Sequence, residues 1–457
     1  MTSERLKINN IEKKKLQRLD NLVKETTNLF SNPNSQQISG FQNIKEFERN
    51  EMILLEEVIG LSNFEKVCNN LKINYWFFDQ FTITILRGLL AKLAKDKRYK
   101  KNFTNLLKLL KKYLENARRK SEKTISFYIP LRLETYSLKD DELKNLKSII
   151  SKNLKISLVK PPKKFSKFMK SDNFKSIFYN RQWVANIRVN SRDLNFSDKI
   201  AESRLNTFFG LFLLSSDFGR DKRMWKKGSQ EGKYEIFSKI LEQTILVLED
   251  GKMVHPSDWW FFDTSLSKKD ISIIGKQIWN IHNKPNGNYP FLMESIKLLG
   301  GMNEEIGNLL RDSLNIYYSA MTEGDLTVSF LKFWIIVEKI VNCGNMFKEN
   351  NFKKRVNFIL SEKDKPFFET IYKKRNLFVH SHNAERISQL DRNFIKNIAE
   401  RLLLFLIDYP FKINNLVELG FVMDNIKSDL KSTNSKISLL SKIKKHKTKN
   451  ETANTNK

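Results

Sequence analysis

A chain of 457 residues is too long for one ordinary hydrophobic core, so we expect two or three folded regions. Hydrophobic residues make up 40% of the sequence and aromatic residues 12%, which excludes a disordered protein. The 81 Lys and Arg residues exceed the 51 Asp and Glu residues and give a formal net charge of +30, so a polyanion is the expected partner, most commonly a nucleic acid. An AT-rich genome, which favours Lys, Asn, Ile and Phe codons, would explain part of this charge without any binding role.

The cysteines and the apolar runs exclude several classes of protein. Cys68 and Cys343 cannot build a disulfide framework, and they lack the spacing of metal ligands. The longest apolar runs, at 208–214 and 402–407, are too short to span a bilayer, and the first ten residues hold no apolar signal region. We therefore expect a cytoplasmic protein that does not act in a membrane.

Residues 1–122 are predicted to form a helical region, because Leu, Ile and Phe recur at intervals of three and four. Its clearest helix is 101–120. The apolar face of that helix consists of Leu106, Leu107, Leu110 and Leu114. The opposite face is basic; it includes Lys120, and its candidate RNA-binding residues are Lys108, Lys111, Lys112, Arg118 and Arg119. Two interpretations stay open, an ordinary solvated helix face and a face that follows a nucleic acid.

The central region, residues 123–266, is predicted to be an α+β domain with an antiparallel sheet. Apolar residues alternate along 124–134, which is typical of a strand, and Pro130 favours a place at the sheet edge. Alternation returns along 183–189. Residues 244–254 predict a hairpin, because Asp250-Gly251 is a strong signal for a tight turn between two strands.

Two other segments of the central region are assigned from their composition. Residues 155–170 are interpreted as a basic connector, since Pro161-Pro162 excludes a helix and the lysines favour solvent. Residues 197–214 are predicted to be helical. His255 precedes an aromatic run at 259–262, which we interpret as a buried strand rather than as a platform for stacking bases.

Residues 267–412 are predicted to form a helical bundle without strands. Apolar residues at helical spacing occur in 269–284, 303–321, 326–341, 366–382 and 390–407. His282, at the end of the first of these segments, is explained by helix capping. Residues 426–457 are rich in Ser, Lys, Asn and Thr, and we expect a basic, disordered tail.

An arginine occupies an apolar position in the segment 371–380. On a helical wheel of about 100° per residue, Arg375 lies in the core-facing arc around Ile371. A charge at such a position must be paired, hydrogen-bonded or used chemically. The helix 326–341 is apolar nearly all round and should lie at the centre of the bundle, and Glu338 is its one acidic residue. A purely structural ion pair between Arg375 and Glu338 is therefore one interpretation.

The same segment resembles a known family. Arg375 is followed directly by Asn376 and, after four intervening residues, by His380, which is similar to the R-x(4 to 6)-H signature of the HEPN superfamily. The form RNLFVH, preceded by a long helix that carries FWIIVEKI, looks most like the Apea-like HEPN subgroup. The resemblance covers roughly 270–410. It implies an HEPN-like bundle that dimerises, and either a metal-independent endoribonuclease or a catalytically quiet relative that binds RNA.

The resemblance also implies a role for each matching residue. Arg375 would hold the scissile phosphate and stabilise the charge that develops on it. His380 would act as general acid or base while the RNA 2′-OH attacks the adjacent phosphorus. Asn376 would orient His380 or bond the phosphate, and Glu338 would hold Arg375 in position. No metal and no other cofactor would be needed.

Three further expectations follow from the resemblance and from the surrounding residues. Lys373 and Lys374 beside the motif are candidate RNA-binding residues. Where some HEPN toxins carry a tyrosine that a nucleotidyltransferase modifies, this chain has His382, so we do not expect regulation by that route; His382 is either a surface residue, which we favour, or a second proton carrier. By analogy the biological role would be that of a toxin-like or phage-defence effector acting on RNA as a homodimer, and the alternative is a non-catalytic RNA-binding or partner-sensing protein. Phosphate-loop, zinc-protease, serine-hydrolase and dinucleotide-binding motifs are absent from the sequence.

Overall fold

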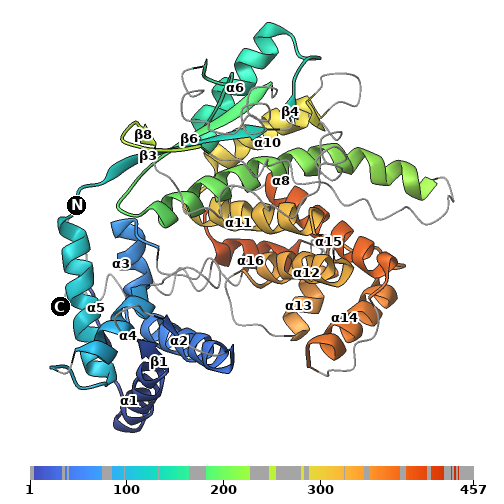
Figure 1. Cartoon of the computed structure of the whole chain (residues 1–457). Coiled ribbons are helices and arrows are strands. Elements are labelled where there is room, and N and C mark those ends of the chain that lie inside the picture. The colour runs from blue at the N-terminus through green and yellow to red at the C-terminus, as the bar shows by residue number, and fades with distance from the viewer. Residues whose placement is uncertain are drawn as a thin grey trace, which may run out of the picture. The chain divides into compact units, whose positions relative to one another are not determined.

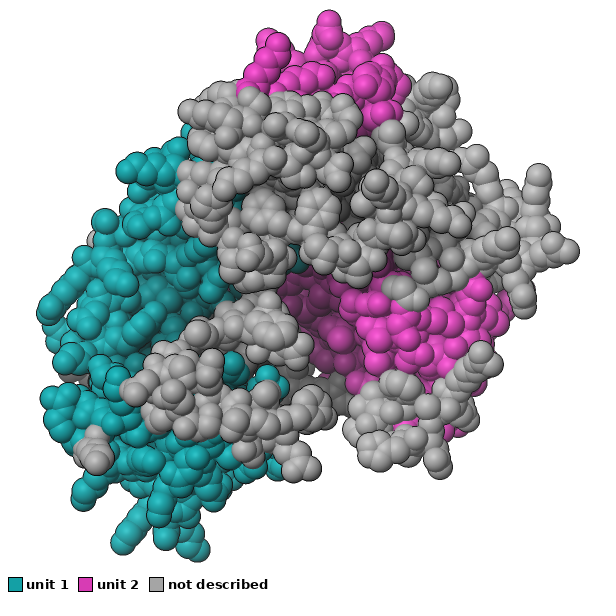
Figure 2. Space-filling view, viewed as in Figure 1, with its two compact units in different colours: residues 1–128, 186–202, 245–260 teal, residues 129–185, 203–244, 261–457 magenta. Residues whose placement is uncertain are grey.

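A computed structural model describes most of the chain. The described residues are 5–32, 37–38, 41–74, 85–96, 98–131, 133–163, 182–226, 246–253, 279–281, 288–323, 325–343, 349–380, 387–408, 413–426, 434, 437–438 and 441. They are mostly helical, with a sheet in the central region and packed helices toward the C-terminus, as the sequence predicts (Figure 1). Two compact units are distinguished, 1–128 with 186–202 and 245–260, and 129–185 with 203–244 and 261–457 (Figure 2). The predicted central region is thus divided between both units.

The helices of the first unit surround a core of leucines and phenylalanines. They are α1 Lys13–Asn28, α2 Phe41–Leu61, α3 Phe64–Leu71, α4 Ile85–Lys95 and α5 Phe103–Arg119. Helix α1 packs against α2, α4 and α5, and α5 also contacts α3 and α4. The amide oxygen of Asn102 caps α5 by accepting from the Asn105 N–H, and the four predicted leucines of α5 are all buried. A short antiparallel pair, β1 Phe30–Asn32 and β2 Gln37–Ile38, lies between α1 and α2 in the sequence and was not predicted.

The central sheet has the strand order β5-β6-β3-β7-β8. Its strands are β3 Lys123–Leu131, β5 Ile156–Val159, β6 Trp183–Ser191, β7 Leu246–Glu249 and β8 Lys252–Met253. The predicted hairpin is confirmed, because β7 and β8 pair antiparallel with Glu249 opposite Lys252. Asp250 and Gly251 both have positive φ, 48° and 80°, which is the backbone shape of a tight two-residue hairpin turn.

The prediction that Pro130 marks an edge strand is wrong. Strand β3 lies between β6 and β7 in the sheet. Its antiparallel pairing with β7 runs from Ile125, opposite Glu249, to Tyr128, opposite Leu246, and ends before the proline. The missing N–H of Pro130 therefore removes no hydrogen bond from that pairing.

Three predicted assignments need correction, two of them because a short strand pairs with a distant segment. Residues 156–159, assigned to the basic connector, form β5, with Ile156 and Leu158 buried. Residues 279–280, predicted helical, form β9 Trp279–Asn280, which pairs parallel with β4 Leu133–Glu134. An apolar spacing that fits a helix also fits a two-residue strand, so the pattern alone does not separate them. The bundle also continues past 412, because α16 Leu416–Asn425 packs against it.

The second unit holds α6 Asp140–Leu154 and the C-terminal helices. These are α10 Tyr289–Gly301, α11 Glu304–Met321, α12 Leu326–Asn342, α13 Glu349–Val356, α14 Lys365–His380, α15 Gln389–Ile407 and α16. Helix α12 contacts α11, α13, α15 and α16, which confirms its predicted place at the centre of the bundle (Figure 1). The four predicted helices of the bundle from 303 onward are present; α6, α10, α13 and α16 were not predicted.

Helix α8 Leu194–Lys226 extends the predicted helix 197–214 in both directions and packs against α11 (Figure 1). Gly210 makes the close approach possible, because a Cβ atom there would lie 2.5 Å from the Leu314 carbonyl oxygen. Phe209 and Tyr318 pack beside it, with ring centroids 5.6 Å apart.

Helix α16 is fixed to the bundle by a buried arginine of α13. The Arg355 guanidinium donates to both carboxylate oxygens of Asp424, over 2.8 and 2.9 Å, and to the Val341 carbonyl oxygen at the end of α12. The pair raises the pKa of Arg355 above its ordinary value, mainly through the hydrogen bonds to Asp424. His255, the aromatic run at 259–262, His282, His382 and nearly all of the predicted tail lie outside the described residues.

Candidate functional site

Arg375 lies on α14, on the side that faces α12. Ile371 and Tyr372, one turn earlier, are buried, whereas 20% of the Arg375 side chain is exposed. The arginine therefore lies at the border between the core and the surface rather than in the middle of the buried arc. Such a position lets a guanidinium be held by the protein while part of it faces solvent.

Glu338 of α12 is the partner of Arg375. The Nη2 atom of Arg375 donates to Oε1 of Glu338 over 2.8 Å. The same Oε1 accepts a second hydrogen bond from Nε1 of Trp334, one turn earlier on α12, also over 2.8 Å. Glu338 is 23% exposed, so the ion pair is partly screened by water. The indole fixes the carboxylate, and the carboxylate fixes the guanidinium.

An aromatic cluster lies beneath this ion pair. The Trp334 ring is stacked on Phe368 of α14, with centroids 6.0 Å apart and planes 4° from parallel. Phe352 of α13 and Tyr372 each lie 5.9 Å from the Trp334 ring. The Cζ atom of Arg375 lies 5.8 Å from the centre of the Trp334 ring, within reach of a cation–π interaction. Rings from three helices thus define where the Arg375 side chain can lie.

The Nη1 and Nε atoms of Arg375 differ in their hydrogen bonding. Its Nη1 atom donates to the side-chain oxygen of Asn376 over 3.1 Å. Its Nε atom is buried and has no hydrogen-bond partner among the described residues. Asn376 therefore contacts the arginine that precedes it, a contact not predicted from the sequence.

The backbone of α14 is helical as far as His380, but the side chain of His380 lies outside the described residues. His380 is the fifth residue after Arg375, which places the two positions about 140° apart around the helix axis and ~7.5 Å apart along it. Asn376 and His380, four residues apart, share one face. The backbone of α14 thus carries positions 375 and 380 on different sides of the helix.

The two lysines before the motif have different surroundings. Lys373 is exposed. Lys374 forms an ion pair over 3.1 Å with Asp391, the residue that completes the N-terminal cap of α15 together with Ser388. Burial alone would raise the pKa of Asp391, but hydrogen bonds from Ser388 and Lys374 lower it below its ordinary value. Lys374 is thus occupied in holding α14 to α15, a contact that the sequence did not indicate.

The predicted basic residues of α5 belong to the first unit. Lys108, Lys111, Lys112 and Arg119 are exposed, and Arg118 is half-buried. Lys112 lines a cleft between α4 and α5, whereas Lys108 and Lys111 are not part of its lining. The basic face of α5 is thus divided between open surface and a cleft.

The residue that sequence reasoning missed at this site is Trp334. Its spacing of four from Glu338 was a usable signal, because residues four apart on a helix are neighbours. In the described part of the chain, no group of three or more His, Cys, Asp or Glu side chains is placed to hold a metal ion. No helix in that part has the length and apolar character needed to cross a membrane.

Comparison with protein-family models, with curated proteins and with solved structures found no match to this chain.

Proposed function

We propose that the chain is a metal-independent endoribonuclease of the HEPN type, with Arg375 and His380 as its catalytic residues. One observation carries this proposal: a partly exposed guanidinium, held by Glu338, Trp334 and Asn376, begins an R-x4-H motif at the end of a bundle helix. A charged transition state is stabilised best by a group that the protein already holds in position before the reaction, and Arg375 is held in this way.

The reaction that these residues support needs no metal. The 2′-oxygen of a ribose attacks the adjacent phosphorus, a P–O2′ bond forms and the P–O5′ bond breaks. An imidazole takes the 2′-hydroxyl proton, and an acid returns a proton to the leaving 5′-oxygen. Arg375 stabilises the negative charge on the phosphoryl oxygens. The products are a 2′,3′-cyclic phosphate and a 5′-hydroxyl.

Positions 375 and 380 lie about 140° apart around the α14 backbone, which favours a site built from two copies of the chain. In that arrangement the arginine of one copy and the histidine of the other would line a shared groove. We therefore propose a homodimer through the C-terminal bundle as the active form. Basic surface, including the exposed Lys373, would bind the RNA backbone.

A test uses full-length protein and end-labelled single-stranded RNA in excess EDTA. We expect cleavage with 2′,3′-cyclic phosphate ends, and a loss of about 100-fold or more in Arg375→Ala and in His380→Ala. The control is Lys339→Gln. Lys339 lies on α12, and its substitution removes an exposed ion pair with Asp312 of α11. Cleavage at undiminished rate in both site variants would refute the assignment.

The second candidate is a non-catalytic RNA-binding protein. The Arg375–Glu338 ion pair is also compatible with this second candidate, because an ion pair packed against aromatic rings can serve the structure of the bundle alone. This candidate predicts salt-dependent RNA binding without turnover, and a His380→Ala variant that behaves like the parent. Growth arrest on expression that disappears in His380→Ala separates the nuclease from this alternative.

A further inference from the structure

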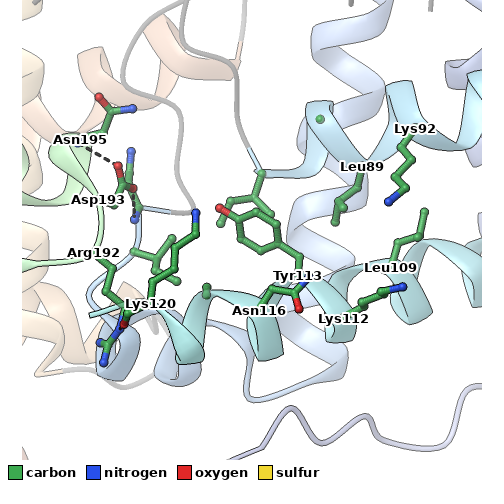
Figure 3. A pocket seen from close by; sticks show the side chains of 15 residues that line it. Leu89, Lys92, Leu109, Lys112, Tyr113, Asn116, Lys120, Arg192, Asp193 and Asn195 are labelled. Carbon is green, nitrogen blue, oxygen red and sulfur yellow. Dashed lines mark hydrogen bonds between the residues drawn. The ribbon is translucent and has the colours of Figure 1, made fainter. Parts of the chain in front are cut away.

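A cleft of about 570 Å³ lies between α4 and α5 in the first compact unit (Figure 3). Every residue that lines it belongs to that unit. Helix α4 contributes Leu89 and Lys92, α5 contributes Leu109, Lys112 and Tyr113, and the segment before α8 contributes Arg192 and Asp193. The volume is within the usual range for small-molecule sites.

The cleft is strongly cationic. Its lining contains Lys92, Lys112, Lys120 and Arg192 against a single carboxylate, Asp193. Three separate segments supply these cations. Lys92 and Lys112 lie at one end of the cleft, and Lys120 and Arg192 lie at the other, beyond Tyr113 (Figure 3). A cleft with this excess of cations favours an anionic ligand.

Arg192 differs from the lysines in having its own partners. It donates to the Glu122 carboxylate over 3.1 Å and to the carbonyl oxygens of Lys120 and Leu71. In the described part of the chain, Lys92, Lys112 and Lys120 form no ion pair, although Lys92 lies in the field of Asp96 and Lys120 in that of Asp193. The lysine ammonium groups are thus available to a ligand. The Arg192 side chain instead connects the segments that form one wall of the cleft.

The polar groups at the far end of the cleft are preorganised. Asp193 accepts hydrogen bonds from the backbone N–H groups of Asn74 and Asn195, over 2.8 and 3.0 Å. Burial raises the pKa of Asp193, and burial together with the Asp193 charge raises the pKa of Tyr113. The Tyr113 phenol therefore stays protonated and can donate, and its ring offers a flat apolar surface.

We propose that this cleft binds a nucleotide through its phosphate groups, with Lys92 and Lys112 at one end and Lys120 at the other as the phosphate ligands. Apolar side chains such as Leu89 and Leu109 and the Tyr113 ring would contact the base. Asp193 offers an acceptor to base or sugar donors. The nucleotide is either free or one residue of a single-stranded chain, since both present the same phosphate and base. This site is separate from the nuclease proposal and does not depend on it.

Gly88 provides a steric test that leaves the charges unchanged. It lies on α4 in the cleft lining, and a Cβ atom there would meet no other atom within 4 Å. A Gly88→Phe side chain would extend into the cleft and occupy part of the space beside Leu89 and Lys92. Gly60 on α2 is the matched control, because its Cβ position is also open and it does not line the cleft.

The experiment measures equilibrium binding to the full chain at low salt. The probes are ATP, AMP, inorganic pyrophosphate, a polyglutamate peptide and a ten-residue oligothymidylate, whose deoxyribose prevents cleavage by 2′-OH attack. We expect Lys112→Gln and Lys120→Gln each to weaken nucleotide binding roughly tenfold or more, and Gly88→Phe to abolish it. The controls Gly60→Phe and Lys24→Gln, an exposed lysine on α1, should bind like the parent.

The probes also identify the source of the nucleotide. Tight binding of ATP or AMP indicates a free nucleotide, and binding of the oligothymidylate alone indicates a strand. Pyrophosphate or a polyglutamate peptide that binds as tightly as the nucleotides would overturn the proposal, as would parent-like binding in the lysine variants. If Gly88→Phe fails to melt cooperatively near the parent temperature, the double variant Lys112→Gln/Lys120→Gln decides the question, and unchanged binding in it would overturn the proposal.

Discussion

Trp334 and Arg375 donate hydrogen bonds to one and the same oxygen atom, Oε1 of Glu338, each over 2.8 Å. The two donors come from different helices, so the carboxylate connects α12 to α14 at the point where the arginine leaves the core. The side chains of Glu338 and Arg375 are both about one-fifth exposed, and an ion pair of this kind contributes little to stability. Its effect is to fix the direction of the guanidinium.

The Glu338→Gln variant should therefore separate positioning from folding. We expect the rate constant for RNA cleavage to fall about tenfold with little change in KM, because the guanidinium loses its charged partner but keeps its own charge. The urea unfolding midpoint should stay close to that of the parent. Asp312→Asn, which breaks the exposed pair with Lys339, is the control and should leave both quantities unchanged. A large drop in stability without a specific loss of rate would assign Glu338 a structural role alone.

The Arg355–Asp424 pair should behave differently, because 8% of Arg355 is exposed and its charge is nearly enclosed. Asp424→Asn leaves a buried guanidinium without an anion, and we expect the free energy of unfolding to fall by about 3 kcal/mol. Helix α16 should also become more susceptible to limited proteolysis. The exposed-pair variant Asp312→Asn is again the comparison, and equal effects of the two substitutions would contradict this account.

Gly210→Ala should destabilise the contact between α8 and α11. The added Cβ would lie 2.5 Å from a backbone carbonyl oxygen, which cannot move away as a flexible side chain would. We expect a loss of about 2 kcal/mol or more in urea unfolding. Gly60→Ala, in a helix with open space around it, should instead be neutral or stabilise by up to ~1 kcal/mol. A neutral Gly210→Ala would show that the two helices separate easily.

Asp198 should make stability depend on pH. Burial, with a smaller effect of Glu202, raises the pKa of Asp198 from 3.8 to about 7. A carboxyl group whose pKa is raised on folding does not change the free energy of unfolding below its unfolded-state pKa. As the pH rises from there toward the folded-state pKa, the group lowers the free energy of unfolding progressively. At about 1.4 kcal/mol per unit, Asp198→Asn should stabilise the protein by at most ~4 kcal/mol at pH 8.5 and by almost nothing at pH 4. Urea titrations at several pH values test this, and a gain independent of pH would exclude titration of Asp198 as the cause.

The sequence predicted those elements whose signals are local. Helices α5, α12 and α15 each carry several turns of regular apolar spacing, and Asp250-Gly251 imposes its turn on the backbone directly. Strand β9 could not be predicted, because it is two residues long and exists only through pairing with Leu133 and Glu134. Short strands take their conformation from a partner, and the partner is not visible in the local pattern.

The site was predictable in part for the same reason. Helical spacing placed Arg375 and Glu338 on facing arcs, and the structure brings them together. The ion pair between Lys374 and Asp391 was not foreseeable, since it depends on how the start of α15 approaches α14. Similarly, Lys112 was expected on one basic face with Lys108, but it also lines the cleft that α4 forms with α5, although it stays exposed.

The pairing of β3 with β7 has a consequence during synthesis. Ile125 pairs with Glu249, and Asp250 is bonded to Thr124 through both backbone and side chain, so this edge of β3 is completed only when the chain has grown by about 125 residues. At ribosomal speeds of about 5–20 residues per second, the wait is roughly 6–25 s. For that time the nascent polypeptide presents an unsatisfied, apolar strand edge, and translation products that stop before residue 246 keep that edge exposed to aggregation.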